Sequence, residues 1–498
     1  MFQPHPAHVV LSSHIHLFAM QNRQERKMLC FYSLLALLNN IMVVFDSFFQ
    51  LFIPWLARLY RLHHDILFTI RICWGLHRTP KNRIPVCYHA LRCHSAGPVA
   101  CCYTRRGRMY FMKRPSQIRQ VLTNKQSFEK LKSPRNSPLA KILGDAITTS
   151  GDDPIAWLAA KRSMRSCHIP AMIPAFHSIS QILVKRAQNW TKHSTGVQLY
   201  NESLCPAIEA SYNAFFGVNL EAELKRREAS YTIYEYAQLV DIFSNTYLAA
   251  GEEDVDRFSN FTRKLCQDFL AQAPASSFGG SIQRLVEDEA DFTLSMGIGN
   301  ALFYVHALPV MTAIVAHWTI YTLMVRHPEH LGRIRRELVQ GERSYFRMCL
   351  KEIIRLYHPA AFMARRVKKN VVVDGVVLSR GSLIIPWVKL LDQDFTFQPD
   401  RWEGNCCLID EVTDDTAGIM YAPFAFGARS CLGKEMVTSI FEDTIAQLLQ
   451  SFDFELLDKD PWKETAPALS HCPDMMVGFK PNHNLRFLVK ERTCSSID

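Results

Sequence analysis

One cysteine near the C-terminal end of the chain has neighbours suited to metal ligation. Cys431 lies in a short loop between Gly427 and Gly433, and an apolar run follows at residues 436–449. Glycines let the backbone turn tightly and approach a flat ligand that side chains would block. The apolar run predicts a helix, and its first N–H groups and dipole favour a thiolate over a thiol. We therefore predict that Cys431 binds a metal as a thiolate; the alternative is a buried structural cysteine in a turn.

Two other side chains flank this cysteine. Phe424 is placed to shield the sulfur from water, and Arg429 can reach a carboxylate beside it. The segment resembles the signature Phe-x-x-Gly-x-Arg-x-Cys-x-Gly of the cytochrome P-450 family, and it matches every fixed position: Phe424, Gly427, Arg429, Cys431 and Gly433. The resemblance implies that Cys431 is the proximal ligand of a haem iron and that Arg429 contacts a haem propionate. Ala425 stands where the family often has glycine or serine.

The resemblance also assigns a structural role to three charged residues. Glu352 and Arg355 are three residues apart in a predicted helix and therefore lie on one face of it. Arg401, within the segment 397–402, stands where the family has the third member of a buried ion network near the proximal face of the haem. We expect these residues to support the fold and to take no part in catalysis.

Further propionate contacts are implied at two places. Arg365 lies where the family has an arginine that reaches a propionate, with the neighbouring Arg366 as a rival. Trp157 and Lys161 resemble a Trp-x-x-x-Arg pair, in which lysine replaces the usual arginine and Arg162 is an alternative. Three basic groups around two propionates meet the charge requirement, and the tryptophan adds one N–H donor.

A long helix predicted over residues 292–326 departs from the family where an acid and an alcohol deliver protons. Counting back from His327 and Pro328 places Thr312 at the alcohol and Met311 at the acid, so Thr312 is the candidate catalytic residue. Pro309 removes one backbone hydrogen bond and is expected to bend the helix, either opening a groove for oxygen or with no catalytic role. Two histidines of this helix are alternative proton donors or ordinary core residues: His306 and His317.

The remaining periodicity predicts a mainly helical fold with small β-sheets, in keeping with the cytochrome P-450 fold. No strand leads into a glycine-rich phosphate turn, which disfavours a doubly wound α/β architecture. The predicted helices are 116–122, 155–165, 179–190, 254–271, 292–326 and 329–339, the predicted strands are 371–373, 376–378 and 383–385, and a closing hairpin is expected within 475–491.

The N-terminal part predicts attachment to a membrane. Residues 28–57 form an apolar stretch long enough to cross a bilayer, which takes about 20 residues. The alternatives are a buried helix and a cleaved signal peptide. We expect a tail at 1–27, the anchor at 28–57, a basic proline-containing linker at 58–86 and the haem-binding catalytic domain at 87–498.

The amino-acid composition indicates which classes of partner this chain is suited to bind. The 498 residues carry a net charge of +10, but the basic residues are scattered without interleaved aromatics, which argues against nucleic-acid binding. A diffuse positive surface suits anionic membrane lipid or an acidic redox partner. The 15 cysteines lack paired CxxC spacings, so the sequence indicates neither a zinc site nor a regular disulfide framework built from them.

Taken with the resemblance, these features predict a monooxygenase with haem b that inserts one oxygen atom from O₂ into an apolar, sterol or fatty-acyl-like substrate. Electrons would come from NADPH through a reductase partner. The expected location is the endoplasmic reticulum membrane, with the catalytic domain facing the cytosol, where cysteines stay reduced. Two alternatives are a haem-thiolate isomerase of oxygenated lipids and a non-catalytic haem-binding membrane protein.

Overall fold

The computed structural model describes most of the chain from Val99 onwards. The described residues are 99–104, 107–112, 114–133, 137–152, 155, 157–158, 161, 173–245, 252–359, 363–385, 396–414, 419–460 and 485–492. The predicted tail, membrane anchor and linker lie outside the described residues, as does most of the predicted helix at 155–165. Their boundaries stay predictions.

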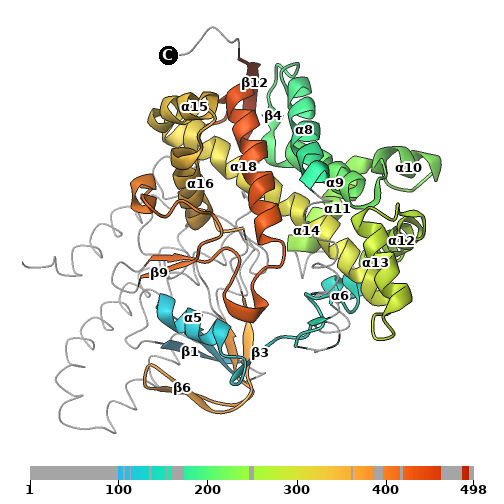
Figure 1. The fold of residues 1–498 in the computed structure, drawn as a ribbon, viewed down its shortest axis with the longest axis vertical. Coiled ribbons are helices and arrows are strands. Elements are labelled where there is room, and N and C mark those ends of the chain that lie inside the picture. Colours follow the sequence, from blue (N-terminus) through green and yellow to red (C-terminus); the bar gives the residue numbers. More distant parts are fainter. Residues whose placement is uncertain are drawn as a thin grey trace, which may run out of the picture.

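A long helix, α14 (Leu294–Ile320), forms the centre of the helical part. Its N-terminus is capped by the Thr293 hydroxyl, which accepts the Met296 N–H. The helix is apolar around nearly its whole circumference, so it must be enclosed by other elements. It packs against α9 (Leu199–Phe216), α12 (Glu252–Gln272) and α18 (Lys434–Ser451) (Figure 1).

The predicted helix at 292–326 is therefore two elements. The helix α14 runs on past Pro309, which has no backbone N–H to donate, and passes at its end into a π-helix, η2 (Tyr321–Arg326). Within the described residues, one helical segment, Leu294–Arg326, is long and apolar enough to cross a membrane, and 83% of its most apolar window is buried inside the protein. Such burial is typical of a core helix.

The other helices surround this centre. The helix α8 (Ile173–Trp190) packs between α9 and α18. The remaining helical elements are α5 (Pro115–Thr123), α6 (Pro138–Leu143), α10 (Leu220–Arg226), α11 (Ile233–Asn245), α13 (Phe278–Asp288), η3 (Pro328–His330), α15 (Leu331–Val339), α16 (Ser344–Leu356), η4 (Pro399–Trp402) and η5 (Gly427–Arg429).

The strands form small separate sheets, and the largest gathers with α5 in the lower part of Figure 1. Its strand order is β1 (Val99–Thr104), β2 (Gly107–Met112), β8 (Leu383–Ile385), β5 (Arg365–Val367) and β3 (Phe128–Lys130). Only the β2 and β8 pair in this sheet is parallel. The smaller sheets pair β6 (Val371–Val373) with β7 (Val376–Leu378), β9 (Val412–Asp414) with β10 (Ile419–Tyr421), and β12 (Arg486–Glu491) with both β11 (Phe452–Leu456) and β4 (Val197–Gln198).

The mainly helical architecture with small sheets is confirmed, and β6, β7 and β8 have the predicted bounds. The turn between β6 and β7 has positive φ at Asp374 and Gly375, as a tight hairpin requires. The hairpin expected within 475–491 is described only from residue 485, and there β12 pairs with β11 and β4. Helix 329–339 begins two residues later than predicted, because a 3₁₀ turn at Pro328–His330 precedes α15.

Two hydrophobic cores meet near the cysteine loop. The larger surrounds α14 and includes Met436 of α18, with Leu432 packed against it. The smaller lies between the largest sheet and α5 and includes Ala425 and Phe426. The loop that carries Cys431 thus connects the two cores and is held from both sides.

Candidate functional site

The loop before α18 is closed by its own backbone hydrogen bonds. The Cys431 N–H donates to the Phe424 carbonyl at 2.8 Å, and the Ala425 N–H donates to the Ala422 carbonyl at 3.1 Å. Ala425 and Gly427 adopt φ values of +59° and +69°. A side chain at Gly427 would also lie 3.3 Å from Thr123 of α5, so glycine is required there.

The two glycines of the cysteine loop differ in backbone conformation. Gly433 has an ordinary φ of −97° as the residue that caps α18. It acts through its backbone, because its N–H hydrogen-bonds the Cys431 sulfur and lowers the thiol pKa. The signature requires glycine at both positions. It does not show that Gly427 is needed for its left-handed backbone and that Gly433 acts through its N–H.

The helix start does stabilise a negative charge on Cys431, as predicted, but burial is the larger effect. Burial raises the pKa of the thiol, while the Gly433 N–H and the Lys434 charge lower it less. The surface area of the residue classes it as exposed. The protein packed around the sulfur nevertheless desolvates it, and desolvation disfavours the charged thiolate. The helix start thus acts in the predicted direction, and a positive partner at the sulfur would add to its effect in favouring the thiolate.

Phe424 is a buried residue of the same loop, with 8% of its surface exposed. Its carbonyl oxygen fixes the backbone of Cys431. Shielding of the sulfur by its ring stays a prediction, whereas the backbone contact is an additional role that the signature did not suggest.

A group of basic side chains surrounds Arg429. The guanidinium forms an ion pair with Asp152 and lies 4.4 Å from the centre of the Trp157 ring. Its Nη1 atom is buried and has no hydrogen-bond partner among the described residues. Arg365 joins the group from strand β5, where it is 7% exposed and donates to the Ala364 carbonyl at 3.0 Å.

Strand geometry separates Arg365 from its rival. Successive residues of a strand point to opposite faces. In β5, Arg365 is buried whereas Arg366 is exposed. The buried arginine is the one that shares the interior with Arg429, and each lowers the pKa of Lys130.

Lys130 was missed by sequence reasoning. It pairs with Arg365 across the β3 and β5 strands, and its Nζ donates to the Ile147 carbonyl at 2.7 Å. Burial first, and then the charges of Arg365 and Arg429, lower its pKa to about 7, against the opposing charge of Asp152. Burial likewise lowers the pKa of Arg365 to about 10. We call Lys130, Asp152, Arg365 and Arg429 the basic cluster.

The basic cluster has three cationic side chains and one carboxylate, and the Asp152 residue is exposed. Such an excess of buried positive charge is costly unless an anion is bound. Together with the unpartnered Arg429 nitrogen, it fits a ligand that carries carboxylates. No sequence pattern identified Lys130, because only strand pairing brings residue 130 next to residue 365.

Trp157 connects the predicted helix residues to this cluster. Three cations lie over its ring, at 4.4 Å for Arg429, 4.6 Å for Lys161 and 5.7 Å for Lys125. The ring therefore serves as a cation–π platform, in addition to the predicted donor role of its indole. Lys161 is half-buried beside it, while Arg162 lies outside the described residues.

The structure brings Glu352, Arg355 and Arg401 together in a buried network. Arg355 donates from Nε and Nη2 to the Glu352 carboxylate at 2.8 Å each. The Arg401 Nε donates to it at 3.0 Å, and the indole of Trp402 at 2.8 Å. Glu352 and Arg355 have no exposed side-chain surface. This arrangement suits a scaffold, because every oxygen of the carboxylate is occupied.

Thr312 lies in α14 with 2% of its surface exposed, and its hydroxyl donates to the Leu308 carbonyl at 2.8 Å. His306 behaves as a core residue, since its Nε2 is 3.0 Å from the Tyr236 hydroxyl, and burial lowers its pKa to about 3. Burial also lowers the pKa of His317 to about 3, and neither ring nitrogen has a hydrogen-bond partner among the described residues.

Comparison with known proteins agrees with this geometry. The family model described as cytochrome P-450 matches residues 309–477. The 11-oxo-beta-amyrin 30-oxidase of Glycyrrhiza uralensis is 26% identical over 203 residues, which are 36% of this chain and 36% of that protein. The alignment therefore spans about a third of that relative's length. Cytochrome P-450 72A15 of Arabidopsis thaliana is 22% identical over 423 residues, 75% of this chain and 78% of the relative.

The fold comparison covers more of the molecule. A solved structure described as retinoic acid bound cyanobacterial CYP120A1 superimposes with a TM-score of 0.63 and 17% identity, covering 80% of this chain and 92% of that one. This likeness concerns the fold. The family model, the relatives and the solved structure all point to the same family, and over residues 309–477 this chain matches the cytochrome P-450 family model.

Proposed function

We propose that this protein is a haem-thiolate monooxygenase that inserts one oxygen atom from O₂ into an apolar substrate. The observation that carries the proposal is the position of Arg429, which belongs both to the loop of Cys431 and to the basic cluster. One short segment thereby joins a metal-ligating sulfur to a site for carboxylates. Haem b has both an iron and two carboxylates, so it fits the pair.

In this proposal Cys431 holds the iron, and Arg429, Arg365 and Lys130 hold the propionates. The buried Nη1 of Arg429, which lacks a partner among the described residues, supports the fit. Lys161 and Trp157 complete the positive surroundings. The thiolate-ligated haem supplies oxygen activation, because electron density from sulfur favours O–O cleavage. Gly427 keeps the loop close to α5, and Gly433 directs its N–H at the sulfur.

Thr312 is proposed to hold and pass protons in the distal part of the site. Its hydroxyl now donates to the Leu308 carbonyl, so its oxygen lone pairs are open to a second donor. Met311 beside it is half-buried and cannot relay a proton. We therefore expect the hydroxyl to work with water and without a neighbouring carboxylic acid at position 311.

The substrate is proposed to be an apolar lipid of sterol or fatty-acyl type. The names of the relatives agree, since one oxidises 11-oxo-beta-amyrin and the solved structure binds retinoic acid. Electrons are proposed to come from an NADPH-dependent reductase, for which the diffuse positive charge provides an attractive surface.

The proposed location is the endoplasmic reticulum membrane, with residues 28–57 as anchor and the catalytic domain in the cytosol. The buried reduced thiols of Cys205, Cys266 and Cys349 support a reducing compartment. Three glycosylation acceptors are exposed on the described surface: Asn189, Asn201 and Asn260. Glycosidase should leave the mass of protein from eukaryotic cells unchanged, whereas a mass shift would place the domain in the lumen.

The function is tested by isotope labelling. Full-length protein in microsomes with reductase and NADPH should incorporate one atom of ¹⁸O from ¹⁸O₂ into a product from a panel of sterols and fatty acids. The Thr312→Ala variant should consume NADPH with less product per electron, while Thr438→Ala in α18 serves as the control. Label in the product from H₂¹⁸O but not from ¹⁸O₂ would contradict monooxygenation.

A second candidate is a haem-thiolate isomerase of oxygenated lipids. Met311 at the acid position favours it, because rearrangement needs no external electrons and no proton relay to oxygen. Turnover of a lipid hydroperoxide or endoperoxide without NADPH would identify this activity. Stoichiometric NADPH use would exclude it, and peroxide-supported turnover of any substrate would exclude a non-catalytic haem-binding role.

A further inference from the structure

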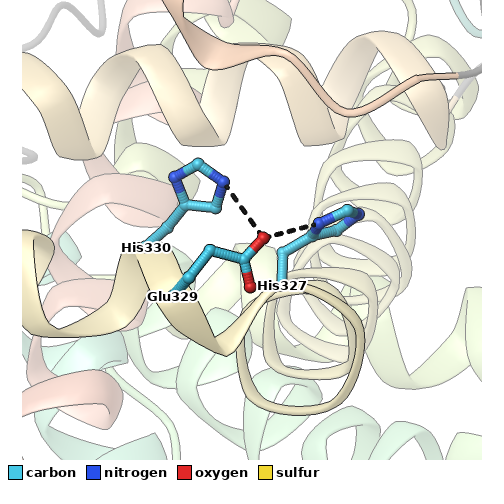
Figure 2. A group of neighbouring side chains, drawn as sticks. All are labelled: His327, Glu329 and His330. Atoms are coloured by element: carbon cyan, nitrogen blue, oxygen red, sulfur yellow. Dashed lines mark hydrogen bonds and ion pairs between the residues drawn. The ribbon is translucent and has the colours of Figure 1, made fainter.

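A cluster of two histidines and one glutamate lies in the turn between η2 and α15, on elements that contribute nothing to the basic cluster. His327, Glu329 and His330 each offer one ligand atom, and these atoms lie within 4.8 Å of one another. Figure 2 shows both imidazoles directed at the same carboxylate oxygen. The His327 Nδ1 is 3.2 Å from Oε1 of Glu329, and the His330 Nε2 is 3.7 Å from it.

These separations match the dimensions of a small ion. Zinc binds nitrogen and carboxylate oxygen at about 2.0–2.2 Å, so the ligand atoms of a tetrahedral site lie roughly 3.4 Å apart. The two printed separations of 3.2 Å and 3.7 Å bracket that value. Calcium and magnesium prefer sets made of oxygen alone, so two imidazoles favour zinc or a similar transition metal.

A residue outside the turn orients one of the ligands. The Nδ1 atom of His330 is 2.5 Å from the Tyr345 hydroxyl at the start of α16. This contact occupies one ring nitrogen and leaves Nε2 to face Glu329 (Figure 2). Histidines that bind metals commonly use the second nitrogen in this way, which fixes the ring before the ion arrives.

An aromatic ring packs against both histidines, and the nearby cations have partners of their own. Phe397 lies 4.8 Å from the His327 ring and 5.2 Å from the His330 ring. The nearby cation Arg326 is paired with Asp460 at 3.2 Å, and the Arg333 guanidinium lies 3.6 Å from the centre of the Tyr345 ring. Glu329 keeps 62% of its side chain exposed, which leaves a path for an ion.

We propose that His327, Glu329 and His330 bind one divalent zinc-type ion, with Tyr345 as a positioning residue and water completing the coordination. The site is independent of the haem and of the proposed monooxygenase activity. The ion would fix the turn after η2 to the start of α15 and, through Phe397, to the segment before Arg401. We expect it to stabilise this side of the protein without taking part in the reaction.

The test uses the full-length haem-loaded protein with ZnCl₂ alone. Equilibrium dialysis should show one fewer zinc ion per chain for Glu329→Gln and for His330→Gln than for the unmodified protein, and zinc should raise the Tm of the unmodified protein but not that of these two variants. Tyr345→Phe keeps all three ligands and should weaken the affinity about 10–100-fold. The control His193→Gln removes an exposed histidine elsewhere and should leave the stoichiometry unchanged.

Cobalt provides a spectroscopic readout that does not depend on stability. Co²⁺ should give visible d–d bands in the haem-free protein that are lost in the His330→Gln variant and retained in His193→Gln. Far-UV circular dichroism of each variant checks the fold. Equal zinc stoichiometry and affinity in the unmodified protein, Glu329→Gln and Tyr345→Phe would overturn the proposal, whatever the haem content.

Discussion

Two charged clusters of this protein are built from similar residues and differ in how their charge is balanced. In the first, the Glu352 carboxylate accepts hydrogen bonds from Arg355, Arg401 and Trp402, and the backbone N–H of Gln398 adds another at 3.1 Å. In the second, Lys130, Arg365 and Arg429 share the single carboxylate of Asp152. The first cluster is closed within the protein, and the second is left positive.

This difference in charge balance indicates which cluster supports the fold and which binds a ligand. A closed buried network gains its stability from mutual pairing, so removing one member leaves the others uncompensated. An open positive cluster contributes little to the stability of the folded state, because burial and the neighbouring like charges both disfavour its charged side chains. Loss of a cation there should affect the bound anion more than the fold, and this contrast can be tested variant by variant.

The largest effect is expected from Glu352→Gln. This change leaves Arg355 and Arg401 buried without their common carboxylate, and we predict a loss of about 3–5 kcal/mol in the free energy of unfolding. Denaturant unfolding monitored by circular dichroism measures it. Glu403→Gln, at the exposed position directly after Trp402, is the matched control and should change stability by less than about 0.5 kcal/mol. Equal losses in the two variants would remove the distinction between closed and open clusters.

Lys130→Met should lower the affinity for haem without lowering stability, the opposite of what is expected for Glu352→Gln. The variant removes a cation that is desolvated beside Arg365 and Arg429, so haem-free protein should keep or gain stability. Haem affinity should fall about 10–100-fold, because a hydrogen bond to a charged group contributes roughly 1.5–3 kcal/mol. Transfer of haem to an excess of apomyoglobin gives the rate of loss. Lys132→Met, two residues away and exposed, should behave as the unmodified protein does.

The pH dependence sharpens the same contrast. The pKa of Lys130 is lowered from 10.5 to about 7 in the folded chain, so its protonated form opposes folding. The contribution of Lys130 to stability of the haem-free protein should therefore increase as the pH rises above 7, while its attraction for an anion declines. Haem affinity should fall over that range by at most about tenfold per pH unit. Parallel titration of Lys130→Met should show neither trend.

The smallest effect concerns the cysteine loop. Ala425 has a φ of +59°, a left-handed conformation that costs an alanine roughly 1–2 kcal/mol. Ala425→Gly should relieve that strain and raise stability by up to about 1 kcal/mol after the greater flexibility of unfolded glycine is subtracted. Ala446→Gly within α18 should instead lower it by about 1 kcal/mol. Thermal unfolding of the two variants decides whether the loop is strained.

The sequence predicted one cluster better than the other for a physical reason. Glu352 and Arg355 are three residues apart on one helix, so local geometry places them together. The basic cluster is assembled by strand pairing between residues far apart in the chain, and Lys130 lies opposite Arg365 only in the folded sheet. Hydrophobic periodicity predicted the long helix 292–326 but could not show its division into α14 and η2.

The cysteine loop shows the same limit. The signature located Cys431 and Arg429, but it could not show that burial outweighs the helix start in setting the thiol pKa. The sequence also did not reveal the proposed metal-binding triad His327, Glu329 and His330. The residues that orient and pack against its histidines, Tyr345 and Phe397, lie far from the turn in sequence. Short motifs indicate chemistry, whereas burial and second partners come from tertiary packing.

The most direct measurement is the difference spectrum of the reduced protein with carbon monoxide. We predict that the full-length protein gives the spectrum of a thiolate-ligated haem, that Cys431→Ser abolishes this spectrum, and that Cys407→Ser, at an exposed position, retains it. Parallel measurement of haem content separates lost ligation from lost haem. A thiolate-type spectrum that persists in Cys431→Ser protein would contradict the assignment of this sulfur as the iron ligand.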